Sequence, residues 1–107
     1  MVKTITAEEL KEKIEEKEDF RLVEVLLPEL FDDWHIPGAI NIPADDMKEI
    51  APGRLKRDEE IVVYCLDFEC GASMRAAKAL LELGYKNIID FAGGKKDWMD
   101  RGYPIEK

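Results

Sequence analysis

The stretch EIVVYCLDFECGASMRAAKALLELG, residues 60–84, decides the fold, because it joins a buried strand to a helix through a loop that begins at a cysteine. Residues 60–65 carry the apolar run IVVY, and an apolar run without alternation is typical of a parallel strand covered on both faces. Residues 66–72 are predicted to form a loop. Residues 73–83 are predicted to form a helix whose alanines allow close packing on a sheet, and Gly84 is a natural stop for it.

Strands and helices alternate over the rest of the chain. Further strands are predicted at residues 2–5, 21–25, 39–42 and 88–91. Further helices are predicted from a Thr6 cap to about Lys17, in a short segment from Pro28, in a turn at residues 45–50 that Pro52 and Gly53 end, and at residues 95–101. Because alternating strands and helices build a parallel sheet with helices packed on it, the pattern predicts an α/β fold.

Length and charge limit the classes of function. The chain has 107 residues, of which 46% are hydrophobic, so we expect residues 1–107 to form a single domain with one core. A formal charge of −8 repels phosphate groups, which argues against nucleic acid and anionic membrane as partners. No apolar run approaches the roughly 20 residues of a membrane span, and the N-terminus lacks a signal-peptide core, so a cytoplasmic protein is expected.

The composition, which has many Glu and Lys residues and no Gln, resembles that of proteins from thermophiles.

The two cysteines, Cys65 and Cys70, are too few for a disulfide scaffold. His35 is the single histidine, so one chain cannot supply the four soft ligands of a structural zinc site. We therefore expect no metal and no cofactor. With a disulfide scaffold and a zinc site excluded, the two cysteines are either structural thiols or reactive ones.

Cys65 occupies the position where an open parallel sheet binds its ligand, directly after the most buried strand and before a helix. Loop N–H groups and the positive end of that helix would lower the pKa of its thiol and hold an anion. On placement alone Cys65 is thus predicted to be a nucleophile. The alternative interpretation is a small apolar residue that ends a core strand.

Two further stretches carry a resemblance to a known family. LVEVLLPELFDDWHIPGAINIP (residues 22–43) resembles the N-terminal signature of rhodanese-like domains, and FAGGKKDWMDRGYP (residues 91–104) is similar to their C-terminal signature. With the strand, cysteine, loop and helix between them, the resemblance covers essentially the whole chain. It implies a three-layer sandwich, in which helices cover both faces of a five-stranded parallel sheet.

The resemblance also implies a sulfurtransferase, in which Cys65 takes a sulfane sulfur from thiosulfate, polysulfide or a persulfide donor. The resulting persulfide would pass its outer sulfur to a thiol, to cyanide or to a protein acceptor. Backbone N–H groups of the loop would stabilise it, and the residues of that loop are Leu66, Asp67, Phe68, Glu69, Gly71, Ala72 and Ser73. Nearby cations that could contribute electrostatically are Arg75, Lys95 and Lys96, the lysines because the Gly93-Gly94 turn should lie near the same crevice. The alternative interpretation of the two lysines is a solvated start of the last helix.

This chain departs from the family pattern at the loop, which is two residues longer than the common form. Asp67 and Glu69 oppose formation of a thiolate and binding of anionic donors such as thiosulfate. We therefore expect polysulfide or a protein persulfide as the donor ahead of thiosulfate. A second departure is Trp34, which replaces the glycine that usually precedes the histidine of the N-terminal signature.

Cys70 is a second thiol in the same loop, five residues after Cys65. It is interpreted either as a resolving or sulfur-accepting thiol or as a fortuitous loop cysteine. The reverse order, with Cys70 as the first nucleophile, would place that nucleophile away from the strand end, which favours Cys65. His35 belongs to the turn of the N-terminal signature, so we expect it to hold the loop by hydrogen bonding rather than to act as a base.

Two other functions are compatible with this fold. A catalytically silent rhodanese-like module that binds proteins is the main alternative, although the cysteine that such modules commonly lose is present here. A phosphatase or arsenate reductase would need His-Cys-x5-Arg, but Tyr64 precedes Cys65 and Gly71 stands where the arginine should be.

Overall fold

In the computed structural model, which describes residues 2–107, five parallel strands form one sheet in the order β1-β5-β4-β2-β3. β4 (Glu60–Tyr64) is central and pairs with β2 (Arg21–Glu24) on one side and β5 (Asn87–Phe91) on the other. The edge strands are β1 (Lys3–Thr4) and β3 (Ile40–Asn41). Because all four pairings are parallel, the carboxyl ends of the strands meet at one edge of the sheet. The predicted α/β fold with a five-stranded parallel sheet is confirmed.

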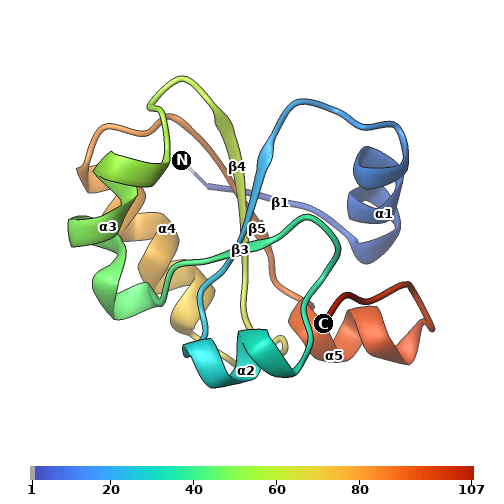
Figure 1. Ribbon diagram of the computed structural model, residues 1–107. Coiled ribbons are helices and arrows are strands. Elements are labelled where there is room, and N and C mark those ends of the chain that lie inside the picture. Colours follow the sequence, from blue (N-terminus) through green and yellow to red (C-terminus); the bar gives the residue numbers. More distant parts are fainter. Residues whose placement is uncertain (1) are drawn as a thin grey trace.

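Helices cover both faces of this sheet (Figure 1). α3 (Met47–Arg54) and α4 (Ala72–Glu82) lie on one face, and α1 (Ala7–Glu15) and α5 (Gly94–Asp100) lie on the other. α2 (Pro28–Asp33) lies at the carboxyl edge of the strands, next to the end of β4, and the short 3₁₀ turn Ala44–Asp46 leads into α3. Among residues 2–107, no helix is both long and apolar enough to cross a bilayer.

The central strand β4 supplies side chains to both cores, since successive side chains of a strand point to opposite faces. Ile61 and Val63 pack with α3 and α4, whereas Val62 and Tyr64 pack with α1 and α5. All four side chains are fully buried, and each such burial stabilises the fold by roughly 1.5–3 kcal/mol. The apolar run that has no alternation in the sequence is therefore explained by two helical layers.

The prediction that Pro52 ends the third helix is wrong, because α3 continues to Arg54. Proline removes one helical N–H group, but Ala51, the residue directly before Pro52, is fully buried against the core. The Tyr85 hydroxyl lies 3.1 Å from the Ala51 carbonyl oxygen and 2.9 Å from that of Leu55, so it also supports the last carbonyls of the helix. Burial and this side-chain contact offset the missing backbone hydrogen bond.

The start of α5 is joined to the segment that follows β4. The Lys95 N–H donates to the Cys65 carbonyl oxygen at 3.0 Å, and the Lys96 N–H donates to that of Leu66 at 2.8 Å. Gly94 makes this approach possible, since its φ is +63° and an added Cβ would lie 2.5 Å from the Cys65 carbonyl oxygen. The position thus requires glycine both for its conformation and for space.

We expect Gly94→Ala to destabilise the fold by at least about 2 kcal/mol, because it adds a left-handed strain of about 1–3 kcal/mol to a backbone clash. Gly53→Ala, in open space within α3, is the matched control and should be neutral or stabilising. Urea unfolding followed by circular dichroism measures both variants. Equal midpoints for Gly94→Ala and the unmutated protein would contradict this account of the contact.

Candidate active site

Cys65 lies at the carboxyl end of β4, and its side chain is fully buried. The loop of residues 66–71 curls back over it, so that Cys65 Sγ donates to the carbonyl oxygen of Cys70 at 3.3 Å. Ser73, in the first turn of α4, gives a backbone and a side-chain hydrogen bond to the same sulfur. The thiol is therefore enclosed by the strand end, the loop and the start of α4.

Asp67 organises the loop. Its Oδ1 accepts the N–H groups of Glu69 and Cys70, each at 3.0 Å, and its carbonyl oxygen accepts the Cys70 N–H at 3.2 Å. An aspartate that accepts the N–H two residues later is a recognised turn-forming pattern, so the sequence Asp67-Phe-Glu69 contained this signal. Asp67 brings Cys70 back toward Cys65, in addition to placing negative charge near the thiols.

The expectation that the Cys65 pKa would be lowered is wrong. Burial raises the pKa of the Cys65 thiol, and the hydrogen-bonding contact with Cys70 raises it further. The Ser73 hydrogen bonds act in the opposite direction, but they do not outweigh burial. In this conformation Cys65 is consequently held as a neutral thiol.

The pKa of Cys70 is shifted in the opposite direction from that of Cys65. Partial burial raises its pKa, but the hydrogen bonds from Cys65 and from the N–H groups of Leu66 and Ala72 outweigh burial, so the pKa of Cys70 lies below that of an ordinary thiol. Asp67 opposes this shift by charge repulsion. Both cysteines are free thiols, and Cys70 is the more exposed of the two. The pair thus combines a buried neutral thiol with an accessible, more acidic one.

The three cations predicted near the site form ion pairs elsewhere. Arg75 lies 3.7 Å from a carboxylate oxygen of Asp45, and Lys96 lies 2.8 Å from one of Asp100. The Lys95 side chain turns inward and is almost fully buried. The Gly93-Gly94 turn does lie against the loop as expected, but its contacts with the loop are made by the backbone of α5 and not by these side chains.

Lys95 forms a buried charged cluster with Glu24, the last residue of β2. Lys95 Nζ lies 3.1 Å from Glu24 Oε1 and donates to the Leu30 carbonyl oxygen at 2.6 Å. The Tyr64 hydroxyl donates to the same Glu24 oxygen at 2.9 Å. The Trp34 ring lies 4.7 Å from Lys95 Nζ, which gives this unusual tryptophan a role in covering a buried cation.

One further buried group was not predicted from the sequence. Asp90 lies on β5 beneath the start of α4, is 4% exposed, and shares a hydrogen bond with the Ser73 hydroxyl. Its Oδ1 has no hydrogen-bond partner, and burial raises the pKa of its carboxyl group. A single polar residue within the apolar strand IIDF was the only signal for it in the sequence.

His35 contacts the C-terminal segment and not the thiols. Its Nδ1 lies 3.0 Å from the Phe31 carbonyl oxygen, its ring stacks on that of Phe31, and its Nε2 lies 3.4 Å from Glu106 Oε1. Its backbone also pairs with Glu106. These contacts tie the end of the chain to the turn after α2.

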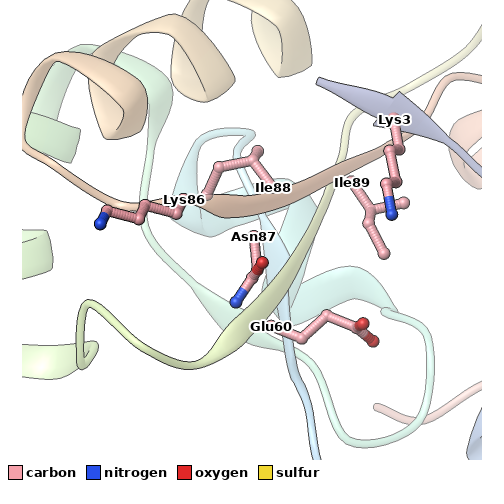
Figure 2. Close-up of a pocket in the computed structure, with 6 residues that line it drawn as sticks. All are labelled: Lys3, Glu60, Lys86, Asn87, Ile88 and Ile89. Carbon is pink, nitrogen blue, oxygen red and sulfur yellow. The ribbon is translucent and has the colours of Figure 1, made fainter. Parts of the chain in front are cut away.

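Exposed apolar side chains surround the loop. Leu66 and Phe68 belong to the loop itself, Leu27 and Leu30 to the start of α2, and all four are exposed. One hollow of about 370 Å³ includes Phe68 in its wall, and another of about 480 Å³ lies between α2 and the start of α4. A smaller cavity of about 50 Å³ is unrelated to the thiols, since Glu60, Asn87 and their neighbours line it at the amino end of β4 and β5 (Figure 2).

Among residues 2–107, no group of three or more His, Cys, Asp or Glu side chains is arranged to hold a metal ion. The chemistry available at this edge of the sheet is that of the two thiols. It includes nucleophilic attack by sulfur and exchange of sulfur–sulfur bonds.

The buried pair predicts a pH-dependent loss of stability in Lys95→Met. Removing the cation leaves Glu24 buried without a counter-charge, which should cost about 3–5 kcal/mol at neutral pH. Burial already raises the pKa of Glu24, so protonation favours the folded state, and the cost should shrink as the pH falls toward 5. Urea unfolding at both pH values measures this, and a cost independent of pH would contradict it.

The difference between the two thiols predicts their order of alkylation. At pH 7 iodoacetamide should modify Cys70 faster than Cys65, because Cys70 is more exposed and its pKa is lowered. The rate at Cys65 should rise with pH beyond the ordinary thiol range, since its pKa is raised. Peptide mass mapping measures both rates, and faster modification of Cys65 at neutral pH would show that the two environments are wrongly assigned.

Comparison with known proteins agrees with this architecture. Residues 6–101 match the model of the rhodanese-like domain. The chain is 30% identical over 106 residues to a sulfurtransferase from Allochromatium vinosum, covering 98% of this chain and 95% of that protein. It is 38% identical over 77 residues to the thiosulfate sulfurtransferase PspE of Escherichia coli, covering 70% of each chain.

A longer relative and a solved structure are also similar to this chain. The chain spans 49% of a putative sulfur carrier protein from Bacillus subtilis, to which it is 29% identical. The crystal structure of a rhodanese-related protein from Thermoplasma volcanium superposes with a TM-score of 0.82 at 31% identity, covering 97% of both chains. From the match over residues 6–101 and the shared fold, the chain belongs to the family of rhodanese-like domains.

Proposed function

We propose that this protein is a sulfurtransferase that carries sulfane sulfur as a persulfide on Cys65. The observation that carries the proposal is the position of Cys65, at the end of the central strand and enclosed by a loop whose far end is the start of α4. Family membership supports it, since relatives in this family are named sulfurtransferases.

The reaction has two steps, each an exchange of a sulfur–sulfur bond. In the first, the Cys65 thiolate attacks the sulfane sulfur of the donor, whose own sulfur–sulfur bond breaks as the remainder leaves with the electron pair. In the second, a thiophilic acceptor attacks the outer sulfur of the persulfide and releases Cys65 as a thiolate. In both steps the Ser73 N–H and hydroxyl donate hydrogen bonds that stabilise the negative charge on the Cys65 sulfur.

Cys65 must lose its proton before it attacks, and in this structure it is a buried neutral thiol. The adjoining Cys70 is the nearest group of suitable chemistry, since its lowered pKa supplies a thiolate in hydrogen-bonding contact with Cys65. We assign to Cys70 the transfer of this proton when the donor enters, which requires the loop of residues 66–71 to open.

We propose polysulfide or a protein persulfide as the donor ahead of thiosulfate. Asp67 and Glu69 lie in the loop, and none of the three cations pairs with either carboxylate. Thiosulfate, which holds two charges on one small group, therefore meets more repulsion there than a polysulfide, which holds them at opposite ends of a chain. Leu66 and Phe68 expose apolar surface beside the thiols, which suits contact with a protein donor or acceptor.

The proposal predicts that sulfur loads on Cys65. Mass spectra recorded directly after exposure to polysulfide should show the intact protein with added sulfur that a thiol reductant removes. Cys65→Ser should lack the sulfur held at residue 65, because a hydroxyl group does not form a persulfide, and any sulfur that this variant keeps should map to the more exposed Cys70. Cys70→Ser is the matched control and should still load, at a lower rate because it lacks the adjoining acidic thiol.

The same measurement with thiosulfate tests the choice of donor, and we expect less loading than with polysulfide. Loading retained in Cys65→Ser but lost in Cys70→Ser would overturn the assignment of the carrier. Absence of loading with either donor would instead favour a rhodanese-like module that binds proteins.

A further inference from the structure

Cys70 lies beside the thiol that the proposed function uses, and the turn at Asp67 places it there. We infer that Cys70 discharges the Cys65 persulfide by forming a Cys65–Cys70 disulfide and releasing hydrosulfide. This inference rests on the proposed function, because it needs a persulfide on Cys65. It gives the Cys65 persulfide a second fate, in which the outer sulfur leaves as sulfide when no acceptor is present.

The contacts of the loop bring the two cysteines together. Cys65 Sγ lies 3.3 Å from the carbonyl oxygen of Cys70, and the two side chains are in hydrogen-bonding contact. Asp67 fixes this curl through its hydrogen bonds with the N–H groups of Glu69 and Cys70. The side chain of Cys70 packs against the same core cluster that contains Cys65.

This proximity decides which sulfur of the persulfide Cys70 attacks. Transfer of the outer sulfur to Cys70 would require that sulfur to lie in line between the two cysteines. Because Cys65 Sγ lies 3.3 Å from the carbonyl oxygen of Cys70, we expect Cys70 Sγ to reach Cys65 Sγ directly, with the outer sulfur as the leaving group. Closeness of two cysteines is also what a disulfide bond requires.

The step balances without an added oxidant. The Cys70 thiolate attacks Cys65 Sγ of the neutral persulfide, and a bond forms between the two Sγ atoms. The bond from Cys65 Sγ to the outer sulfur breaks, and the outer sulfur leaves with the electron pair and its own proton as hydrosulfide. The outer sulfur is reduced to sulfide and the Cys70 sulfur is oxidised from thiolate to disulfide, while Cys65 Sγ keeps the oxidation level that it had in the persulfide.

The environments of the two thiols set the direction of the step. Cys70 is the more exposed, and the N–H groups of Leu66 and Ala72 support its thiolate, so it is the better attacking group. Cys65 is buried at the end of β4 and carries the electrophilic sulfur. The closed disulfide has no free thiol to load, so a thiol reductant must reopen it by exchange before the next cycle.

The test loads the unmutated protein and Cys70→Ser with polysulfide, removes excess donor without adding thiol, and follows intact mass and free sulfide. The unmutated protein should lose the added sulfur, release one sulfide per protein, and end at the mass of the reduced protein less two hydrogen atoms. Cys70→Ser should keep its persulfide at least about tenfold longer, because it has no thiolate to attack Cys65.

A second measurement is independent of sulfur loading. Equilibration of the unmutated protein with glutathione redox buffers should give an internal disulfide, found by peptide mapping between Cys65 and Cys70. Equal persulfide lifetimes in the two loaded proteins, or no internal disulfide in any buffer, would overturn the inference and leave the proposed function standing. If neither protein loads sulfur, the proposed function fails and the inference falls with it.

Discussion

The hydrogen bonds from the first N–H groups of α5 to the carbonyl oxygens of Cys65 and Leu66 are the contact on which the rest of the site depends. They fix the end of the central strand to a helix that belongs to the opposite end of the sequence. Gly94 is the residue that permits this approach, because a Cβ there would collide with the Cys65 carbonyl oxygen. With that end fixed, the loop must rise, curl at Asp67 and return to α4 directly above the Cys65 thiol.

The same contact explains the buried charge beneath the site. Once α5 is fixed against the loop, the side chain of Lys95 points into the protein, where Glu24 and the Leu30 carbonyl oxygen receive it. Trp34 covers the ammonium group from the side. A chain with a formal charge of −8 thus places one of its cations in the interior, where it holds α5 and α2 to the central strands, and leaves the loop around the thiols acidic.

The sequence predicted the sheet, the position of Cys65 and the approach of the Gly93-Gly94 turn, since each follows from local pattern and from the rules of parallel sheets. It did not predict the environment of the thiol. The expectation of a lowered pKa counted the start of the helix but not burial, and burial depends on how far the loop folds back. Lys95 was interpreted as a site cation, because sequence alone does not show which way a side chain leaves a helix. The prediction that Pro52 ends the helix also failed on tertiary packing, because burial of Ala51 offsets the loss of the hydrogen bond that proline removes.

Within the rhodanese-like family, this chain combines the family fold with a loop that holds two thiols of different character. The buried thiol suits storage of a sulfur atom away from water, and the accessible one suits exchange with whatever lies outside. Both properties arise from the Asp67 turn, which curls the loop, and from the burial of Cys65 at the end of β4.

The most direct test of the central claim is a crystal structure of the protein after exposure to polysulfide, determined on Cys70→Ser so that the persulfide persists. The account predicts one additional sulfur atom bonded to Cys65 Sγ, enclosed by residues 66–71 and the Ser73 N–H. An unmodified Cys65 in protein that has demonstrably taken up polysulfide sulfur would contradict it.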